Sequence, residues 1–286
     1  MKSARRPVRV GRIPYINCYP VYGAIDRGII HLQGELTDGV PTSLNRAMAD
    51  GQLDVSVVSA IEYARESARY LLLPDLAISC DGPVRSVLLF SKRPAEELGG
   101  RRVVVSRSSM TSVALLDLLF AHVWGVRPET VRGDAEATDL VRFAEEEHDA
   151  RLVIGDAALL LSGEAAVDGA PSYPFVYDLG EEWKRWTGQP FVFAVWVAQR
   201  STPIAEALAT HASLIASRDW GLAHLDQLAL QASNATGVRR EVCAEYLSGL
   251  DYGLSYPHLA GLTEFYRRLV QIGRVPNGTL AFLPAA

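Results

Sequence analysis

The chain has 286 residues, of which 49% are hydrophobic, and its formal net charge of −5 comes from basic and acidic residues that are interspersed. This length is enough for two lobes of ordinary domain size. The absence of a basic stripe argues against a nucleic-acid partner, and no hydrophobic run reaches the roughly 20 residues that cross a bilayer.

Short β-branched runs alternate with helical segments in the first third of the chain, as in βαβ units built on a largely parallel sheet. Residues 8–11 predict a first strand and residues 43–50 a helix. A second buried strand is predicted over 55–59, followed by an amphipathic helix over 61–67. Residues 86–91 predict another strand, which crosses to a second set of units.

The second set begins with a strand at 103–105 and a helix over 111–123, and continues with a strand at 152–154 and a helix from about 157. An aromatic and β-branched strand follows at 191–197. Helices predicted over 203–231, 238–247 and 262–272 then return to the first lobe.

The sequence therefore predicts an α/β protein of two lobes, each a mixed sheet flanked by helices. Residues 1–91 and 199–286 form a discontinuous lobe I, and residues 92–198 form lobe II. Because two strands connect the lobes, we expect a hinge with a ligand-binding cleft beside it.

The start of the chain and its cysteines indicate the compartment. Basic residues at the start are followed by Val8-Arg9-Val10-Gly11-Arg12 and not by an uninterrupted apolar stretch, so we expect no export signal. The cysteines Cys18, Cys80 and Cys243 match neither a metal-binding pair nor a disulfide framework. We therefore expect a cytoplasmic protein.

A segment rich in hydroxyl groups lies between the strand at 103–105 and the apolar helix that follows it. Residues 106–112 read Ser-Arg-Ser-Ser-Met-Thr-Ser. A helix N-terminus offers unpaired backbone N–H groups and partial positive charge, which suit a carboxylate or phosphate. An ordinary N-cap needs only one hydroxyl, so five of them favour ligand binding by Ser109, Thr111 and Ser112.

Two further pairs of candidates follow predicted buried strands. Ser59 ends the strand at 55–59 and Ala60 follows it, and lining of the cleft and simple helix capping are equally compatible with the sequence there. Gly155 and Asp156 follow the strand at 152–154. For Asp156 we favour an N-cap, with a carboxylate facing the cleft as the alternative.

Asn17 and Ser86 are less distinctive when taken alone. Asn17 lies in an aromatic loop framed by Pro14 and Pro20, where an Asn is usually a turn residue. Ser86 begins the predicted crossover strand, where a lone Ser is usually a satisfied hydroxyl.

Several catalytic motifs are missing from the sequence. It has no Gly-x-Ser-x-Gly, no P-loop, no His-Glu-x-x-His and no GxGxxG after a strand, and its six histidines share no metal spacing. We expect neither a metal nor another cofactor.

The segment 10–20, Val-Gly-Arg-Ile-Pro-Tyr-Ile-Asn-Cys-Tyr-Pro, closely resembles the N-terminal signature of the menaquinone-biosynthesis chorismate dehydratases. The likeness extends over nearly the whole chain and includes residues 53–63, 84–87, 154–159 and 179–196. The resemblance implies a fold like the type II periplasmic binding proteins. It also implies a lyase of the futalosine route, which removes water from chorismate to give 3-[(1-carboxyvinyl)oxy]benzoate.

The resemblance also assigns roles to particular residues. By motif match, Asn17 and Ser86 are similar to the family's two functionally important polar residues, and we predict that they are catalytic. The sequence leaves open whether Arg12, Tyr15 and Asp156 touch the substrate or support the scaffold. The predicted substrate-binding residues are Arg12, Tyr15, Ser59, Ala60, Ser109, Thr111, Ser112, Gly155 and Asp156.

Two alternatives are kept. The sister enzyme of this fold and pathway acts on cyclic dehypoxanthinyl futalosine and carries Ile-His-Glu, with a catalytic His, where this chain has Ile154-Gly155-Asp156. The missing histidine disfavours that activity. The other alternative is a cytoplasmic protein that captures a small anion without catalysis. A homodimer is compatible with the sequence, which leaves the oligomeric state open.

Dehydration of chorismate gives an aromatic product, so the enzyme has mainly to position the reacting groups. We expect the helix N-terminus at Thr111 and Ser112 to hold one carboxylate, and Ser59 and Ser86 to contact other polar groups. Asn17 would orient the reacting end, and the substrate's own side-chain carboxylate can serve as the base. Closure of the lobes would exclude water.

Overall fold

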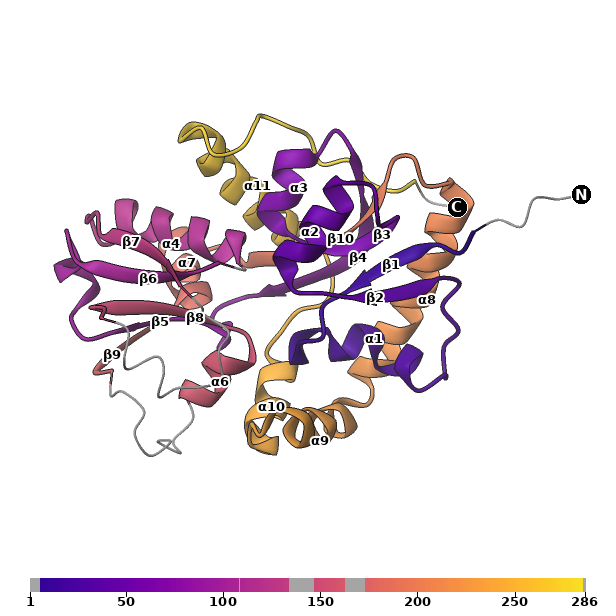
Figure 1. Cartoon of the computed structure of the whole chain (residues 1–286), viewed down its shortest axis with the longest axis horizontal. Helices are drawn as coiled ribbons and strands as arrows, with labels where there is room; N and C mark the ends of the chain where they lie inside the picture. The colour runs from indigo at the N-terminus through magenta and orange to yellow at the C-terminus, as the bar shows by residue number, and fades with distance from the viewer. Residues whose placement is uncertain (1–5, 108, 134–146, 163–172, 285–286) are drawn as a thin grey trace, which may run out of the picture.

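Two five-stranded mixed sheets, each flanked by helices, organise the chain into two lobes that lie side by side (Figure 1). The computed structural model describes residues 6–107, 109–133, 147–162 and 173–284. Within these ranges, no helix is both long and apolar enough to span a membrane. The predicted two-lobed α/β architecture is confirmed.

The sheet of lobe I has the strand order β2-β1-β3-β10-β4. Strand β1 pairs in parallel with β2 and β3, whereas β10 runs antiparallel between β3 and β4. The strands are β1 (Arg9–Arg12), β2 (Glu35–Asp38), β3 (Val55–Ser59), β4 (Tyr70–Cys80) and β10 (Phe191–Gln199).

The sheet of lobe II repeats this arrangement in the order β7-β6-β8-β5-β9. Strand β6 is parallel to β7 and β8, and β5 runs antiparallel between β8 and β9. The strands are β5 (Val87–Ser91), β6 (Arg102–Ser106), β7 (Glu129–Gly133), β8 (Ala150–Ile154) and β9 (Phe175–Asp178).

The sheet pairing corrects the predicted lobe boundaries at two strands. The prediction ended lobe I after residue 91 and lobe II after residue 198, but β5 belongs to the sheet of lobe II and β10 to the sheet of lobe I. Every residue of both strands is buried. A strand buried on both faces reads as a continuous apolar run, so its pattern does not reveal which sheet it joins.

The helices cover both faces of the two sheets (Figure 1). In lobe I they are η1 (Ile16–Cys18), α1 (Tyr19–Asp26), α2 (Pro41–Ala49), α3 (Ala60–Glu66), α8 (Ile204–Leu222), α9 (Leu225–Thr236), α10 (Arg240–Ser248) and α11 (Tyr256–Gln271). In lobe II they are η2 (Ala95–Glu97), α4 (Met110–His122), α6 (Asp156–Ser162) and α7 (Leu179–Thr187).

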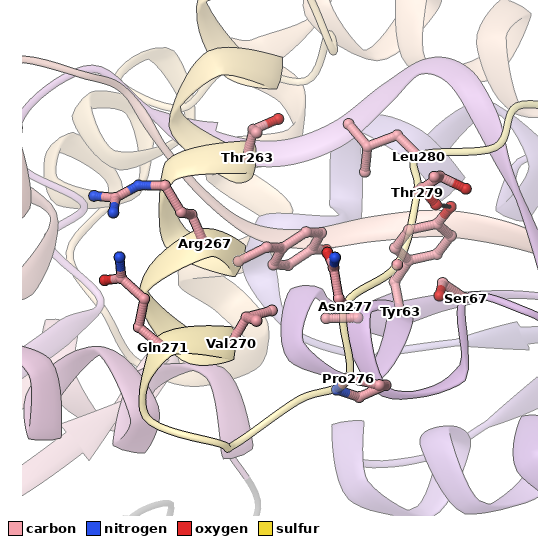
Figure 2. A pocket seen from close by; sticks show the side chains of 13 residues that line it. Tyr63, Ser67, Thr263, Arg267, Val270, Gln271, Pro276, Asn277, Thr279 and Leu280 are labelled. Atoms are coloured by element: carbon pink, nitrogen blue, oxygen red, sulfur yellow. Dashed lines mark hydrogen bonds between the residues drawn. The ribbon is translucent and has the colours of Figure 1, made fainter.

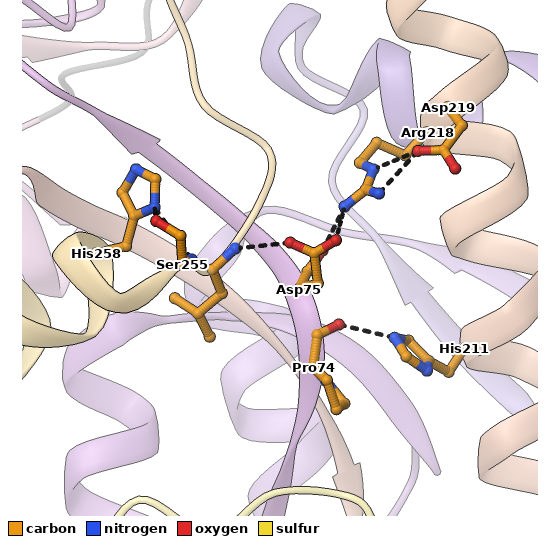
Figure 3. A network of polar contacts seen from close by, with 8 residues as sticks. Pro74, Asp75, His211, Arg218, Asp219, Ser255 and His258 are labelled. Carbon is orange, nitrogen blue, oxygen red and sulfur yellow. Dashed lines mark hydrogen bonds and ion pairs between the residues drawn. The ribbon is translucent and has the colours of Figure 1, made fainter. Parts of the chain in front are cut away.

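Strand β4 bulges away from β10 in its middle, and a polar network holds the bulge (Figure 3). Asp75 has a left-handed backbone, φ +51°, which is unusual for a residue other than glycine. Arg218 of α8 is buried and donates to the carbonyl and to the carboxylate of Asp75. Leu254 N–H donates to the other carboxylate oxygen at 3.3 Å. The network fixes α8 and the segment before α11 against the sheet.

Candidate functional site

A cavity of about 80 Å³ lies where the two lobes meet, beside the segments that connect them. It is smaller than the roughly 300 Å³ at which pockets for ligands of drug size begin. The cavity is lined by Ile13, Tyr15, Asn17, Pro41, Ser59, Ile78, Val84, Ser86, Val87, Ser109, Thr111, Ser112, Ile154, Gly155, Phe193 and Ala194.

Asn17 contributes a buried acceptor to this cavity. The residue lies in η1, directly after the loop that follows β1. Its side-chain Oδ1 is shielded from solvent and has no hydrogen-bond partner among the described residues. An unsatisfied buried carbonyl is destabilising by about 1–3 kcal/mol, so such an acceptor suits a ligand that donates to it.

Ser86 lies on the connection between β4 and β5, where its side chain is almost completely buried. Its Oγ accepts a hydrogen bond from Tyr246 Oη at 2.8 Å. Its carbonyl accepts from Gly155 N–H at 2.8 Å, which ties the connection to the end of β8. The preceding residue, Arg85, has φ +64°, a strained backbone for a side-chain-bearing residue.

The asparagine of η1 and the serine of the connection thus face the hydroxyl groups of lobe II across one cavity. At the start of α4, Ser109 is the N-cap: its Oγ accepts from Ser112 N–H at 3.4 Å and donates to Ser112 Oγ at 2.7 Å. Thr111 Oγ1 accepts from Ile61 N–H of α3 at 3.1 Å. The hydroxyl-rich segment therefore caps its own helix and also contacts lobe I. Ser108 lies outside the described residues.

Of the two functions that the sequence allowed for Ser59, its side chain shows the lining of the cavity and not helix capping. It precedes α3 as the N-cap residue without a side-chain capping bond, and it lines the cavity. Asn45 Nδ2 donates to Ser59 Oγ at 3.0 Å, so the Ser59 hydroxyl hydrogen remains available. Ala60 is not among the lining residues, and its carbonyl accepts from Tyr266 Oη at 2.7 Å.

Gly155 lines the cavity with φ +64°, but Asp156 does not line it. The predicted N-cap role of Asp156 is wrong, because α6 begins at this residue and Gly155 O accepts the first helical bonds. Instead, Asp156 Oδ1 accepts from Ile16 N–H of lobe I at 3.3 Å. Burial raises the pKa of Asp156 to about 6.

Arg12 is held by ion pairs outside the cavity. Its guanidinium forms a bidentate pair with Asp38, at 2.6 and 2.9 Å, and a further ion pair with Asp26. The hydrogen bonds with Asp38 raise the pKa of Arg12 above its usual value. Arg12 does not line the cavity, whereas Tyr15 does.

Two residues that support the site were not predicted. Tyr246 of α10 contacts Ser86 from 160 positions away. Asp178, the N-cap of α7, accepts from four backbone N–H groups, two of which belong to Val84 and Arg85 on the connection that carries Ser86. Of these contacts, only the N-cap role of Asp178 could have been predicted from local sequence, because Asp178 directly precedes a helix with acidic residues in its first turn.

A second cavity, of about 470 Å³, lies between α3, α11 and the C-terminal segment (Figure 2). None of the predicted site residues lines it. Its tyrosine hydroxyls are already engaged, since Tyr63 Oη donates to Thr279 O and Tyr266 Oη donates to Ala60 O. The cavity between the lobes is therefore the better candidate for polar chemistry. Among the described residues, no cluster of His, Cys, Asp or Glu could hold a metal ion.

Comparison with known proteins identifies the family of the chain. A family model described as menaquinone biosynthesis matches residues 8–271. A chorismate dehydratase of Thermus thermophilus is 32% identical over 276 residues, which cover 92% of this chain and 96% of that protein.

Solved structures show the same fold at low sequence identity. A protein of Archaeoglobus fulgidus superimposes with a TM-score of 0.77 at 20% identity, covering 94% of this chain and 98% of that one. An alkanesulfonate-binding protein of Xanthomonas axonopodis pv. citri gives 0.69 at 14% identity, covering 97% and 98%. The periplasmic aliphatic sulphonate binding protein of Escherichia coli gives 0.63 at 14%, covering 97% and 96%. The predicted periplasmic-binding-protein-like fold is confirmed.

Proposed function

Since the chain belongs to the menaquinone-biosynthesis family, we propose that it removes water from chorismate to give 3-[(1-carboxyvinyl)oxy]benzoate. The observation that carries the proposal is the meeting of Asn17 and Ser86 with the hydroxyl groups of α4 in one cavity. Those two residues are the ones for which motif resemblance predicts catalysis. They come from separate parts of the chain, and only the fold brings them together.

The reaction needs positioning more than strong acid–base chemistry. One ring C–H bond and the neighbouring C–OH bond break, the electron pair of the C–H bond becomes the new ring double bond, and water leaves. Because the product ring is aromatic, the step is intrinsically favourable. The proton passes first to the side-chain carboxylate of the substrate, which lies beside the ring carbon that loses it, and from there to the departing hydroxyl, which leaves as water. Oriented groups alone can lower such a barrier by several kcal/mol.

The α4 N-terminus is proposed to hold a substrate carboxylate. Backbone N–H groups at a helix start and the positive end of the helix dipole favour an anion, and Ser109, Thr111 and Ser112 all line the cavity. Ser59 and Ser86 are proposed to donate to the remaining oxygens. Asn17 Oδ1, which has no partner among the described residues, would accept the hydroxyl hydrogen of the substrate.

Binding and turnover require motion between the lobes. The cavity of about 80 Å³ is too small for a ring that bears two carboxylate groups. We propose that the lobes open at the connections 81–86 and 188–190 to admit chorismate, and then close to exclude water.

A cytoplasmic location and a place in the futalosine route are part of the same proposal. All three cysteines are buried and none forms a disulfide, which suits a reducing compartment. The proposed reaction would be an early step of that route.

The test is direct. Purified protein is mixed with chorismate, without metal or added cofactor, and products are followed by chromatography with mass detection against a control without protein. We expect loss of one water per chorismate over many turnovers, and at least a hundredfold slower turnover for Asn17→Ala and for Ser86→Ala. Arg12→Gln serves as the matched polar control outside the cavity.

Other outcomes of this experiment would indicate a different function or different catalytic residues. Chorismate returned unchanged, together with turnover of cyclic dehypoxanthinyl futalosine, would identify the sister activity. Saturable binding of chorismate without any product would identify a binding protein. Full turnover by both the Asn17→Ala and Ser86→Ala variants would contradict the residue assignment while leaving the reaction intact.

A further inference from the structure

Helix α10 holds the connection that carries Ser86, and one of its side chains reaches the serine hydroxyl itself. Tyr246 Oη lies 2.8 Å from Ser86 Oγ, and both side chains are almost fully buried, at 2% and 3% exposure. Next to this contact, Glu245 forms an ion pair with Arg85 at 2.7 Å. Two successive residues of α10 thus bind two successive residues of the connection.

The same helix also packs against the helical turn that carries Asn17. Contacts join α10 to η1 (Ile16–Cys18). Tyr246 therefore belongs to the helix that packs against both of the residues proposed to be catalytic. It is not among the residues that line the cavity.

The direction of the hydrogen bond decides what Ser86 can do. A serine hydroxyl has one hydrogen to donate and two lone pairs that accept. Burial raises the pKa of the Tyr246 phenol above its usual value, so the phenol remains protonated and donates. With one lone pair of Ser86 Oγ occupied by Tyr246, the serine keeps its own hydrogen for another acceptor.

We propose that Tyr246 is a positioning residue for the dehydration: its phenol donates to Ser86 Oγ and so directs the Ser86 O–H into the cavity, toward an oxygen of the substrate. This inference rests on the proposed function. Ser86 is the group that touches substrate, and Tyr246 acts only through it. Without the phenol, the serine hydroxyl is free to rotate and spends part of its time pointing away from the substrate.

The chain offers a matched control in Tyr252. This tyrosine is equally buried, at 2% exposure, and its hydroxyl has no hydrogen-bond partner among the described residues. Tyr252→Phe removes the same atom from a similar environment without removing a bond to Ser86.

The experiment compares kcat and KM for chorismate in the wild type and in four variants: Tyr246→Phe, Tyr252→Phe, Ser86→Ala and the double variant Ser86→Ala/Tyr246→Phe. We expect Tyr246→Phe to lower kcat roughly tenfold, the effect of one neutral hydrogen bond, and Tyr252→Phe to stay within twofold of the wild type. In the Ser86→Ala background, Tyr246→Phe should have no further effect, because its partner is already absent.

A purely structural role gives a different pattern. Equal losses of kcat from Tyr246→Phe in both backgrounds, equal losses from Tyr246→Phe and Tyr252→Phe, or no loss from Tyr246→Phe would each overturn the proposal. If turnover by Ser86→Ala is below detection, the same four proteins of the double-mutant cycle can be compared by their calorimetric affinity for the product. Tyr246→Phe should then weaken binding only when Ser86 is present. A wild-type protein that does not convert chorismate removes the proposed function and this inference with it.

Discussion

Asp156 of lobe II accepts a hydrogen bond from the backbone N–H of Ile16 in lobe I, at 3.3 Å, across 140 positions of the sequence. The contact joins the start of α6 to the helical turn that carries Asn17. Its acceptor is a buried carboxyl whose pKa burial raises to about 6. The junction between the lobes therefore contains a group that titrates within the physiological range.

Asp156→Asn should change the pH dependence of stability. The pKa of Asp156 is about 6 in the folded protein, against an ordinary value of 3.8. Between these two pH values the folded state binds the extra proton, so stability falls as pH rises through this window. Above pH 6 the ionised carboxyl destabilises the fold by up to about 3 kcal/mol. We expect Asp156→Asn to match the wild type in urea unfolding near pH 4 and to be about 1–3 kcal/mol more stable at pH 8. A constant difference across pH would contradict this.

Asn17→Ala should separate activity from stability. The Oδ1 atom of Asn17 is buried and has no partner among the described residues, so its removal deletes no hydrogen bond that stabilises the fold. We expect a free energy of unfolding within about 1 kcal/mol of the wild type, but turnover at least a hundredfold slower. Guanidinium unfolding and the chorismate assay measure the two quantities. A large loss of stability would mean that Asn17 has a structural partner.

Gly155→Ala tests the left-handed turn at the end of β8. The new Cβ would lie 3.7 Å from the Tyr15 ring, an ordinary contact, so the destabilisation of about 1 kcal/mol comes from the backbone. Gly237→Ala is the control, since Gly237 has φ +78° and open space around it at the end of α9, away from the connections between the lobes. We expect similar losses of stability for both variants, and a several-fold lower kcat/KM only for Gly155→Ala, whose methyl group enters the cavity.

Asp178 tests the support of the connection between β4 and β5. Its carboxylate accepts from Val84 and Arg85 N–H at 3.0 and 2.6 Å and also caps α7. We expect Asp178→Ala to lower the free energy of unfolding by about 2–4 kcal/mol, and Asp178→Asn, which keeps one acceptor oxygen, by about half as much. Equal losses from the two variants in a denaturant titration would show that the side-chain charge, not its hydrogen bonds, is what stabilises.

Arg12→Gln should affect the scaffold only. The guanidinium is fully engaged by Asp26 and Asp38, away from the cavity. Because those carboxylates are well exposed, we expect a loss of about 1 kcal/mol, with kcat and KM for chorismate within twofold of the wild type. A tenfold rise in KM with unchanged stability would instead place Arg12 in contact with the substrate.

Several buried strands and the segments after them were predictable because their apolar runs are continuous. Strand β4 was not predicted, although most of its residues are buried, because Pro74 and Asp75 interrupt its apolar run. The predicted strand at 55–59 matches β3, and the predicted strand at 8–11 differs from β1 by one residue at each end. Strand β2, which reads Glu-Leu-Thr-Asp, was not predicted, because it is an exposed edge strand without an apolar run. The predicted helix over 203–231 is in fact two helices, α8 and α9, which separate at residues 223–224, directly after the last turn of α8 that contains Gly221.

The site was predictable only in part, for a physical reason. Ser59, Gly155 and the start of α4 follow buried strands, and in α/β sheets the ends of such strands meet in a crevice. Tyr246 and Asp178 reach the same place through tertiary packing across 160 and 94 positions. No local pattern in the sequence encodes such a contact.

The insertion of β10 between β3 and β4 has a consequence for how the chain is synthesised. All strands of the lobe II sheet lie between residues 87 and 178, whereas the lobe I sheet cannot close until residue 199 has left the ribosome. Lobe II can therefore fold first during translation. The strands β3 and β4 are synthesised earlier, and until β10 pairs between them each has an unpaired edge that is prone to aggregation. A chaperone that binds nascent chains would be expected to protect the first eighty residues and not the middle of the chain.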